Sequence, residues 1–264
     1  MVVGGGYATF PVRVSKGEAD FSITESTSLL WAYQGVEAFK EKYLNLRAIN
    51  GAMEGQYGIF VVLADVPINS LEEVKEKRYP IKLGVGQVGR SDEYVARKML
   101  EAVGLSYDAI KAQGGTVTNA AWEQIGGLLR DRMIDGYLGG VTRDNPTLEE
   151  VAIARPLRFL PFSEAVIKKI VAIGRRADVL PAKSYTGQDK DVPSIVDDLV
   201  LFTRAEVPSE VVYTVTKAII EGKDKVAVAW RAWEKEWDPV KGASKVPILL
   251  HPGAELYYKE KGWI

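Results

Sequence analysis

Short apolar runs alternate along this chain with longer segments in which apolar residues recur at helical spacing. Residues 57–63 read Tyr-Gly-Ile-Phe-Val-Val-Leu, a run with the length and composition of a buried strand. In residues 29–42, leucine, tyrosine, valine and phenylalanine recur three or four positions apart, as on one face of an amphipathic helix. Because strand-like and helix-like segments alternate and glycines separate many of them, the pattern predicts an α/β fold.

The same patterns place the remaining elements along the chain. Strands are predicted at residues 21–24, 46–49, 57–63, 81–85, 137–141, 167–173 and 194–203. Helices are predicted at residues 29–42, 91–103, 119–131, 209–221 and 223–237. A further helix begins after Asn69, with Ser70 as its N-cap and Glu73 at the capping-box position. Gly104 is placed to stop the helix of residues 91–103.

Composition narrows the classes of protein to which the chain can belong. The 264 residues are 47% hydrophobic and 26% charged, with a formal net charge of -1, as in a globular protein with a sizeable core. A net charge this small gives no attraction to nucleic acid. No apolar run approaches the roughly 20 residues of a membrane span, and no signal peptide is visible at the N-terminus.

The side chains for metal binding and catalysis are scarce. Cysteine is absent, and the one histidine, His251, has no second histidine with which to share a metal. We therefore expect His251 to be structural and the protein to hold no metal. Neither the G-x-S-x-G nor the P-loop pattern occurs. Adjacent acids such as Asp197 and Asp198 are expected to be solvated, so the sequence predicts no catalytic residues and no enzyme.

One glycine-rich turn has two interpretations. Gly84-Val-Gly-Gln-Val-Gly89 fits the G-x-G-x-x-G pattern between a predicted strand and a predicted helix. The alternative function is therefore a dinucleotide-dependent oxidoreductase. Asp108 lies near the spacing of the required acid, but its segment does not resemble a buried strand. The favoured interpretation is a cradle of backbone amides at a helix N-terminus that binds a carboxylate and needs no cofactor.

Arg90 follows this turn at the start of a predicted helix. A cation there opposes the helix dipole, so a compensating negative charge is expected. A bound carboxylate would supply that charge and could take both arms of the guanidinium. The alternative is a solvated arginine on a loop.

Residues 251–264, His-Pro-Gly-Ala-Glu-Leu-Tyr-Tyr-Lys-Glu-Lys-Gly-Trp-Ile, form an amphipathic segment that ends near a possible helix-capping glycine. This segment resembles the C-terminal signature of the TAXI family, the solute receptors of one branch of the TRAP transporters. Gly17-Glu-Ala-Asp20, with Ser26, Ala32 and Gly35, matches the order of a second family motif. The resemblance extends from about Gly4 to the end of the chain.

The resemblance implies a two-lobe, type II periplasmic-binding-protein-like fold with two crossover strands. Lobe one would comprise residues 1–65 and 195–264, and lobe two residues 66–194. A small carboxylate, such as glutamate or another dicarboxylate, would bind in the cleft between the lobes. The partners implied are the permease subunits of a TRAP transporter, and the location implied is periplasmic or extracytoplasmic. Compared with the family, the chain begins after the signal peptide and the first strand–helix unit.

The ligand-binding residues are predicted from the glycine-rich turn together with the family motifs. They are Ser26, Thr27, Gly89, Arg90, Ser91, Gly139, Gly140, Thr142 and Arg143. Arg90 and Asp92 stand where the family has small residues, and Thr27 stands where it has an acid. Several alternatives stay open, because Ser26 could be an ordinary N-cap, Arg143 could pair with Asp144, and Trp122 could stack on a ligand. The tryptophans Trp230, Trp233 and Trp237 are expected to pack in a core stripe.

Overall fold

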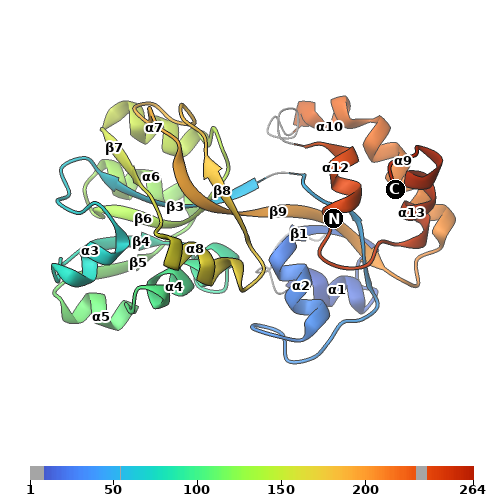
Figure 1. The fold of residues 1–264 in the computed structure, drawn as a ribbon, viewed down its shortest axis with the longest axis horizontal. Helices are drawn as coiled ribbons and strands as arrows, with labels where there is room; N and C mark the ends of the chain where they lie inside the picture. The colour runs from blue at the N-terminus through green and yellow to red at the C-terminus, as the bar shows by residue number, and fades with distance from the viewer. Residues whose placement is uncertain (1–8, 54, 230–236) are drawn as a thin grey trace. The chain divides into compact units, whose positions relative to one another are not determined.

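The computed structural model of the protein describes residues 9–53, 55–229 and 237–264 (Figure 1). The chain divides into two compact units. Unit 1 comprises Met1–Gly55 and Asp197–Ile264, and unit 2 comprises Gln56–Val196. The chain therefore enters unit 2 after Gly55 and returns to unit 1 at Asp197. Compared with the lobes implied by the family resemblance, this division places residues 56–65 and 195–196 with the second unit.

Unit 1 is built around the second part of strand β9 (Val192–Arg204). Strands β1 (Phe21–Glu25) and β2 (Leu46–Asn50) both pair antiparallel with it. In its described residues, the helices are α1 (Thr9–Ser15), α2 (Ser26–Gln34), α9 (Ser209–Glu221), α10 (Lys223–Ala229), α12 (Pro239–Ser244) and α13 (Pro252–Glu260). Trp237 and Tyr257 are among the side chains buried in its core.

Unit 2 contains a mixed sheet whose parallel part positions the candidate site. Its strands are β3 (Gly55–Leu63), β4 (Lys82–Val85), β5 (Thr116–Asn119), β6 (Gly136–Val141), β7 (Leu157–Leu160) and β8 (Arg176–Leu180). Its helices are α3 (Leu71–Glu76), α4 (Ser91–Ala102), α5 (Tyr107–Ala112), α6 (Trp122–Arg130), α7 (Pro146–Ala154) and α8 (Glu164–Val171). Strand β4 pairs parallel with both β5 and β6. Parallel strands end at one edge of the sheet, and α4 and α6 begin after β4 and β5 at this edge, which is where α/β folds bind ligands.

The other strands complete this sheet in antiparallel fashion. Strand β3 pairs with β6 on one side and with β7 on the other, and β8 pairs with the first residues of β9. In β4, a Cβ added to Gly84 would lie 2.5 Å from the side chain of Ile134. Gly84 is therefore required by close packing within unit 2.

Two predicted elements differ from those observed in length or type. Helix α2 ends at Gln34 and not at residue 42, because Gly35 adopts a left-handed conformation with φ 68° and donates its amide to the Trp31 carbonyl. Residues 167–173, predicted as a strand, lie largely in helix α8. Val166 and Ile170 are its buried residues, four positions apart, and its lysines lie among the less buried ones. The lysines are therefore part of a helical pattern, and the strand prediction is wrong.

Two further helices begin or end at other residues than predicted. Residues 116–119 form strand β5, so the helix predicted from residue 119 begins only at Trp122. Of the helix predicted at residues 223–237, residues 223–229 form α10. Residues 230–236, including Trp230 and Trp233, lie outside the described part of the chain. Trp237 is buried in the core, as expected for a packing residue, and its Nε1 donates to Asn50 Oδ1 at 2.8 Å.

The predicted N-cap of α3 is confirmed. The Ser70 hydroxyl accepts the Glu73 amide at 3.3 Å, while the Glu73 carboxylate reaches back to the amide of Asn69 at 2.8 Å. His251 is 1% exposed, and its Nδ1 accepts the Gly253 amide at 3.1 Å, which caps α13. The histidine is therefore structural, as predicted. Within the described residues, no helix combines the length and apolar character of a membrane span.

Candidate functional site

The carboxylate of Asp92 lies in the first turn of α4, at the carboxyl edge of unit 2. Its Oδ1 accepts hydrogen bonds from the Glu93 amide at 3.1 Å and from Arg90 Nε at 3.2 Å. Its Oδ2 accepts the Tyr137 hydroxyl at 3.3 Å. A Cβ added to Gly86 would lie 2.5 Å from the carboxyl carbon, so the missing side chain leaves the space for this carboxylate. The N-terminus of α4 thus already holds a negative charge, as the helix dipole favours.

The carboxylate expected beside Arg90 is supplied by Asp92 of the chain itself. The guanidinium forms an ion pair with Asp92, while 57% of the Arg90 side chain remains exposed. Gly89 has φ 86°, and nothing lies within 4 Å of an added Cβ, so this corner of the turn is open. Ser91 is buried as the first residue of α4. The charge of Arg90 is therefore balanced internally, while part of the guanidinium side chain remains accessible to a second anion.

An aromatic pair lies beside this turn. Burial, followed by the charge and hydrogen bond of Asp92, raises the pKa of Tyr137 well above its usual value, so its hydroxyl remains a donor. Trp122 packs edge to face on Tyr137, with ring centroids 5.0 Å apart. The Trp122 Nε1 donates to Asn145 Oδ1 at 2.9 Å, and Asn119 Nδ2 donates to a carbonyl of the turn at 2.9 Å. The aromatic and amide side chains at the ends of the parallel strands are therefore fixed in place.

The second predicted anion site, at the start of α2, also holds an internal carboxylate. The amide of Thr27 donates to Asp197 Oδ1 at 3.1 Å, and its hydroxyl donates to Asp197 Oδ2. Thr27 and Asp197 are 1% and 2% exposed, so the expectation that Asp197 is solvated was wrong. Ser26 is the first residue of the helix and not its N-cap. Asp197 therefore occupies the position that a ligand carboxylate was expected to take in unit 1.

Gly139 and Gly140 lie in strand β6, as predicted for residues 137–141, and the predicted role of these two glycines in ligand binding must be judged from this position. They stand opposite Ile59 and Gly58 of β3 in the antiparallel ladder. A Cβ added to Gly140 would lie 3.7 Å from the Cβ of Asp92, so the end of β6 lies beside the α4 turn. Gly140 is thus near the site, while its backbone is part of the sheet.

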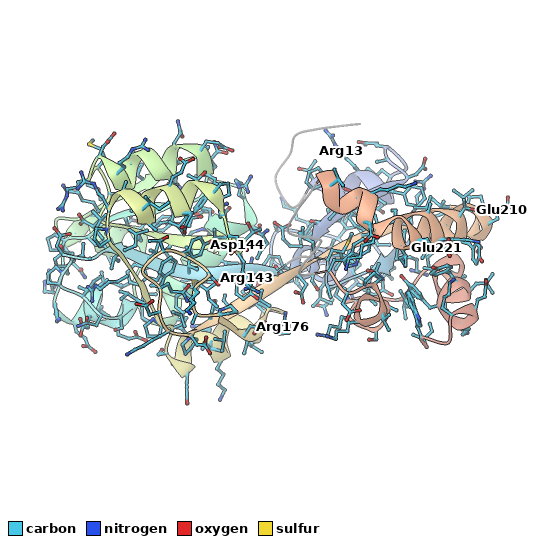
Figure 2. The ribbon with its side chains drawn as sticks, turned by 90° about the horizontal axis from the view of Figure 1, so that it is seen from above. Arg13, Arg143, Asp144, Arg176, Glu210 and Glu221 are labelled. Atoms are coloured by element: carbon cyan, nitrogen blue, oxygen red, sulfur yellow. The ribbon has the colours of Figure 1, made fainter. Side chains whose placement is uncertain are left out.

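Thr142 and Arg143 follow β6 and are both partly buried. Figure 2 labels Arg143 and its neighbour Asp144. The carbonyl of Thr142 accepts the Tyr185 hydroxyl at 2.6 Å, which ties the end of this strand to the loop before β9. Asp144 is exposed and has φ 54°. These residues continue the chain beyond the carboxyl end of β6.

Unit 2 therefore brings Arg90, Ser91 and Gly140 near Asp92, whereas Ser26 and Thr27 belong to unit 1. Sequence reasoning did not predict the two acids that organise these turns. From the sequence, Asp92 is only a departure from the small residues of the family, and Asp197 is only one of two adjacent acids. Both acids lie next to helix starts in space, but only Asp92 does so in sequence.

The geometry does not support a dinucleotide site at residues 84–89. The Asp92 carboxylate fills the space beside Gly86 and would repel a pyrophosphate. Asp108 lies in helix α5 with 95% of its side chain exposed and pairs with Lys111. The strand that follows β4 ends instead at Asn119, which is not an acid. The second requirement of the dinucleotide fingerprint is therefore missing.

Known proteins resemble this chain over most of its length. The NMT1-like family matches residues 11–262. A putative periplasmic sulfonate-binding protein of an ABC transporter, SsuA from Methylobacillus flagellatus KT, is 11% identical, with 97% of this chain and 79% of that chain covered and a TM-score of 0.52.

Two further solved structures show a similar likeness. PhnD1 from Prochlorococcus marinus, in complex with methylphosphonate, is 12% identical and covers 100% of this chain and 85% of its own, with a TM-score of 0.50. The periplasmic binding protein BugD is 15% identical, with 98% and 84% covered and a TM-score of 0.51. At these identities the likeness shows a shared fold, which confirms the predicted α/β, periplasmic-binding-protein-like class.

Proposed function

The chain belongs to the NMT1-like family and has the fold of periplasmic binding proteins, and from this premise we propose that it is a solute receptor. It binds a small solute outside the cytoplasmic membrane and delivers it to a membrane permease without chemical change. The family match and the fold support the receptor role. The alternative oxidoreductase has no such support, because the Gly86 turn is filled by a carboxylate and the strand after β4 ends at Asn119 and not at an acid.

The solute that best suits the carboxyl edge of unit 2 is a small carboxylate, such as glutamate or another dicarboxylate. The observation that carries this proposal is the position of Arg90 before the first turn of α4, where 57% of its side chain stays exposed although it pairs with Asp92. A solute carboxylate beside this turn would meet the exposed part of the Arg90 guanidinium. The planar guanidinium offers it two parallel hydrogen bonds.

The transporter class rests on the C-terminal segment. Residues 251–264 resemble the TAXI receptors, so the proposed partners are the permease subunits of a TRAP transporter. Two of the similar structures are described as a sulfonate-binding protein and as a complex with methylphosphonate. A helix N-terminus also binds these oxyanions, so both serve as comparison ligands in any test. Preference for a carboxylate over both is part of the proposal.

The variant Arg90→Gln tests the site directly. Loss of a charge-assisted hydrogen bond is expected to weaken carboxylate binding about tenfold or more, measured by titration calorimetry against a panel of carboxylates. The matched control is Lys111→Gln, which removes one positive charge from exposed helix α5. Equal affinities of the two variants for the same carboxylate would show that Arg90 does not bind it.

A further inference from the structure

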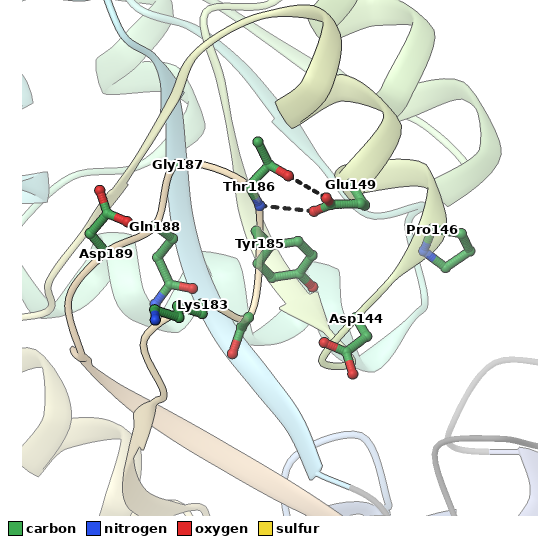
Figure 3. A pocket seen from close by; sticks show the side chains of 10 residues that line it. Asp144, Pro146, Glu149, Lys183, Tyr185, Thr186, Gly187, Gln188 and Asp189 are labelled. Atoms are coloured by element: carbon green, nitrogen blue, oxygen red, sulfur yellow. Dashed lines mark hydrogen bonds between the residues drawn. The ribbon is translucent and has the colours of Figure 1, made fainter.

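A pocket of about 600 Å³ opens in unit 2 between the start of α7 and the loop before β9 (Figure 3). Its wall includes Glu149 of α7 and, from the loop, Lys183, Tyr185, Gln188 and Asp189. This volume lies within the range of small-molecule sites. None of these residues belongs to the proposed carboxylate site at the α4 turn.

The walls of the pocket are held by hydrogen bonds. The Glu149 carboxylate accepts the amide of Thr186 at 2.9 Å and its hydroxyl at 2.5 Å, as the dashed lines in Figure 3 show. The Tyr185 hydroxyl donates to the carbonyl of Thr142, and its ring stacks on Phe159 at a centroid distance of 5.1 Å and an angle of 12°. The pocket is thus preformed, so a ligand would not need to order the loop.

The side-chain amide of Gln188 indicates which kind of ligand the pocket could bind. Its side-chain nitrogen donates to the carbonyls of Pro181 and Lys190, both at 3.0 Å, and to that of Leu180 at 3.4 Å. Because all three partners are acceptors, the orientation of the amide is fixed. The residue is 5% exposed, and its Oε1 is buried without a hydrogen-bond partner. Figure 3 shows this oxygen on the side of the amide that faces Tyr185.

Gln188 Oε1 therefore lacks a hydrogen-bond donor, and a ligand in the pocket could supply it. A buried acceptor without a partner is rare in native proteins, and a ligand is one of its explanations. The nearby carboxylates of Glu149 and Asp189 outnumber the ammonium of Lys183, so a positively charged donor is favoured. Within the described ranges of the chain, no three acidic or histidine side chains gather as a metal site. The ligand should therefore combine a positive charge with N–H groups. An organic cation has both, whereas a metal ion has no N–H group.

We propose that this pocket binds a small organic ammonium ion. Its N–H groups donate to Gln188 Oε1 and to the carboxylate of Asp189, and Glu149 adds negative potential from the opposite wall. The site is separate from the α4 turn and takes a ligand of opposite charge. It therefore does not depend on the proposed receptor function, and either proposal can fail without the other.

The probe is 1,4-diaminobutane, with the neutral 1,4-butanediol as a matched control of the same length. Titration calorimetry at physiological salt should give saturable binding of the diamine and none of the diol. The ¹⁵N spectrum should show the side-chain amide of Gln188 and the backbone amide of Thr186 shifting with the same saturation. Equal binding of both compounds, no binding of the diamine, or shifts confined to other residues would overturn the proposal.

The variant Asp189→Asn removes one carboxylate from the wall and leaves the anchoring of Gln188 intact. It is expected to weaken diamine binding about fivefold, the usual effect of one exposed charge pair. Asp108→Asn, on exposed helix α5, removes an equal charge elsewhere in unit 2 and should bind as the wild type does. Identical affinities of the two variants would show that the attraction is only the general charge of the surface, and the proposal would fail.

Discussion

At the scale of single residues, the candidate site is organised by an acid of the chain itself. Asp92 fills the cradle beside Gly86 and competes with any solute carboxylate for the guanidinium of Arg90. The cradle and the arginine were predictable from the glycine pattern and the helix dipole. The competitor was not, because the direction in which a side chain folds back over its own helix start depends on tertiary contacts such as the Tyr137 hydroxyl.

Replacement of this acid should therefore strengthen the binding of anions. The variant Asp92→Asn keeps the size of the side chain and removes its negative charge, so a solute carboxylate is repelled less. We expect its affinity to rise about fivefold to tenfold, since nearby charges at partly exposed sites contribute on the order of 1 kcal/mol. Titration calorimetry of Asp92→Asn beside Asp108→Asn measures the effect. Weaker binding by Asp92→Asn would mean that Asp92 recognises a cationic group of the solute.

A second residue-scale prediction concerns His251. Burial lowers the pKa of its imidazole below the usual 6.5, while the carbonyls of Ala205 and Val207 partly oppose that shift. The unfolded chain therefore binds a proton at a higher pH than the folded chain does. The stability that His251 contributes is complete above the unfolded pKa and is lost as the pH falls below it.

Urea unfolding tests this sign. The wild type should lose more free energy of unfolding between about pH 8 and about pH 5.5 than the variant His251→Asn, which keeps an acceptor at the N-cap of α13 but cannot be protonated in this range. All carboxyl groups of the two proteins titrate alike, so the difference isolates the imidazole. Parallel pH profiles for the two proteins would contradict the assignment of a buried neutral histidine.

At the scale of elements, the start of α2 depends on a residue far away in the sequence. The variant Thr27→Val removes the hydroxyl that donates to Asp197 and leaves this buried carboxylate with one bond fewer. We expect a loss of about 1–3 kcal/mol in the free energy of unfolding, measured in urea. The adjacent variant Ser26→Ala, at a half-buried position, should change it by less than about 0.5 kcal/mol. Similar losses in both variants would argue against a specific Thr27–Asp197 contact.

The elements themselves were predicted where the local signal was strong. Residues 57–63 and 209–221 form the strand and the helix that their apolar patterns indicate. The errors occurred where a local signal competed with the pattern. Gly35 ends α2 although apolar residues continue at helical spacing, and the short strand β5 has exposed ends that leave little alternation to detect.

At the scale of the whole molecule, the α/β class agrees with what glycine joints and alternating elements indicate, whereas the division into two lobes was expected only from the family resemblance. The first boundary was harder to place, because β3 begins at Gly55 in unit 1 and forms its ladder with β6 and β7 in unit 2. A continuous strand gives no turn signal at such a crossing. Contacts distant in sequence therefore determine where one unit ends, and a linear pattern contains little information about them.

The most direct test of the receptor proposal is the thermal unfolding of the purified chain with a panel of carboxylates, sulfonates, phosphonates and NAD(P). A solute at about 100 times its dissociation constant adds about 2.7 kcal/mol of stability, which corresponds to a rise of about 5–10 °C in Tm. We predict such a rise for one small carboxylate and an unchanged solute at the end of the experiment. A rise with NAD(P) alone, or with no carboxylate in the panel, would contradict the proposal.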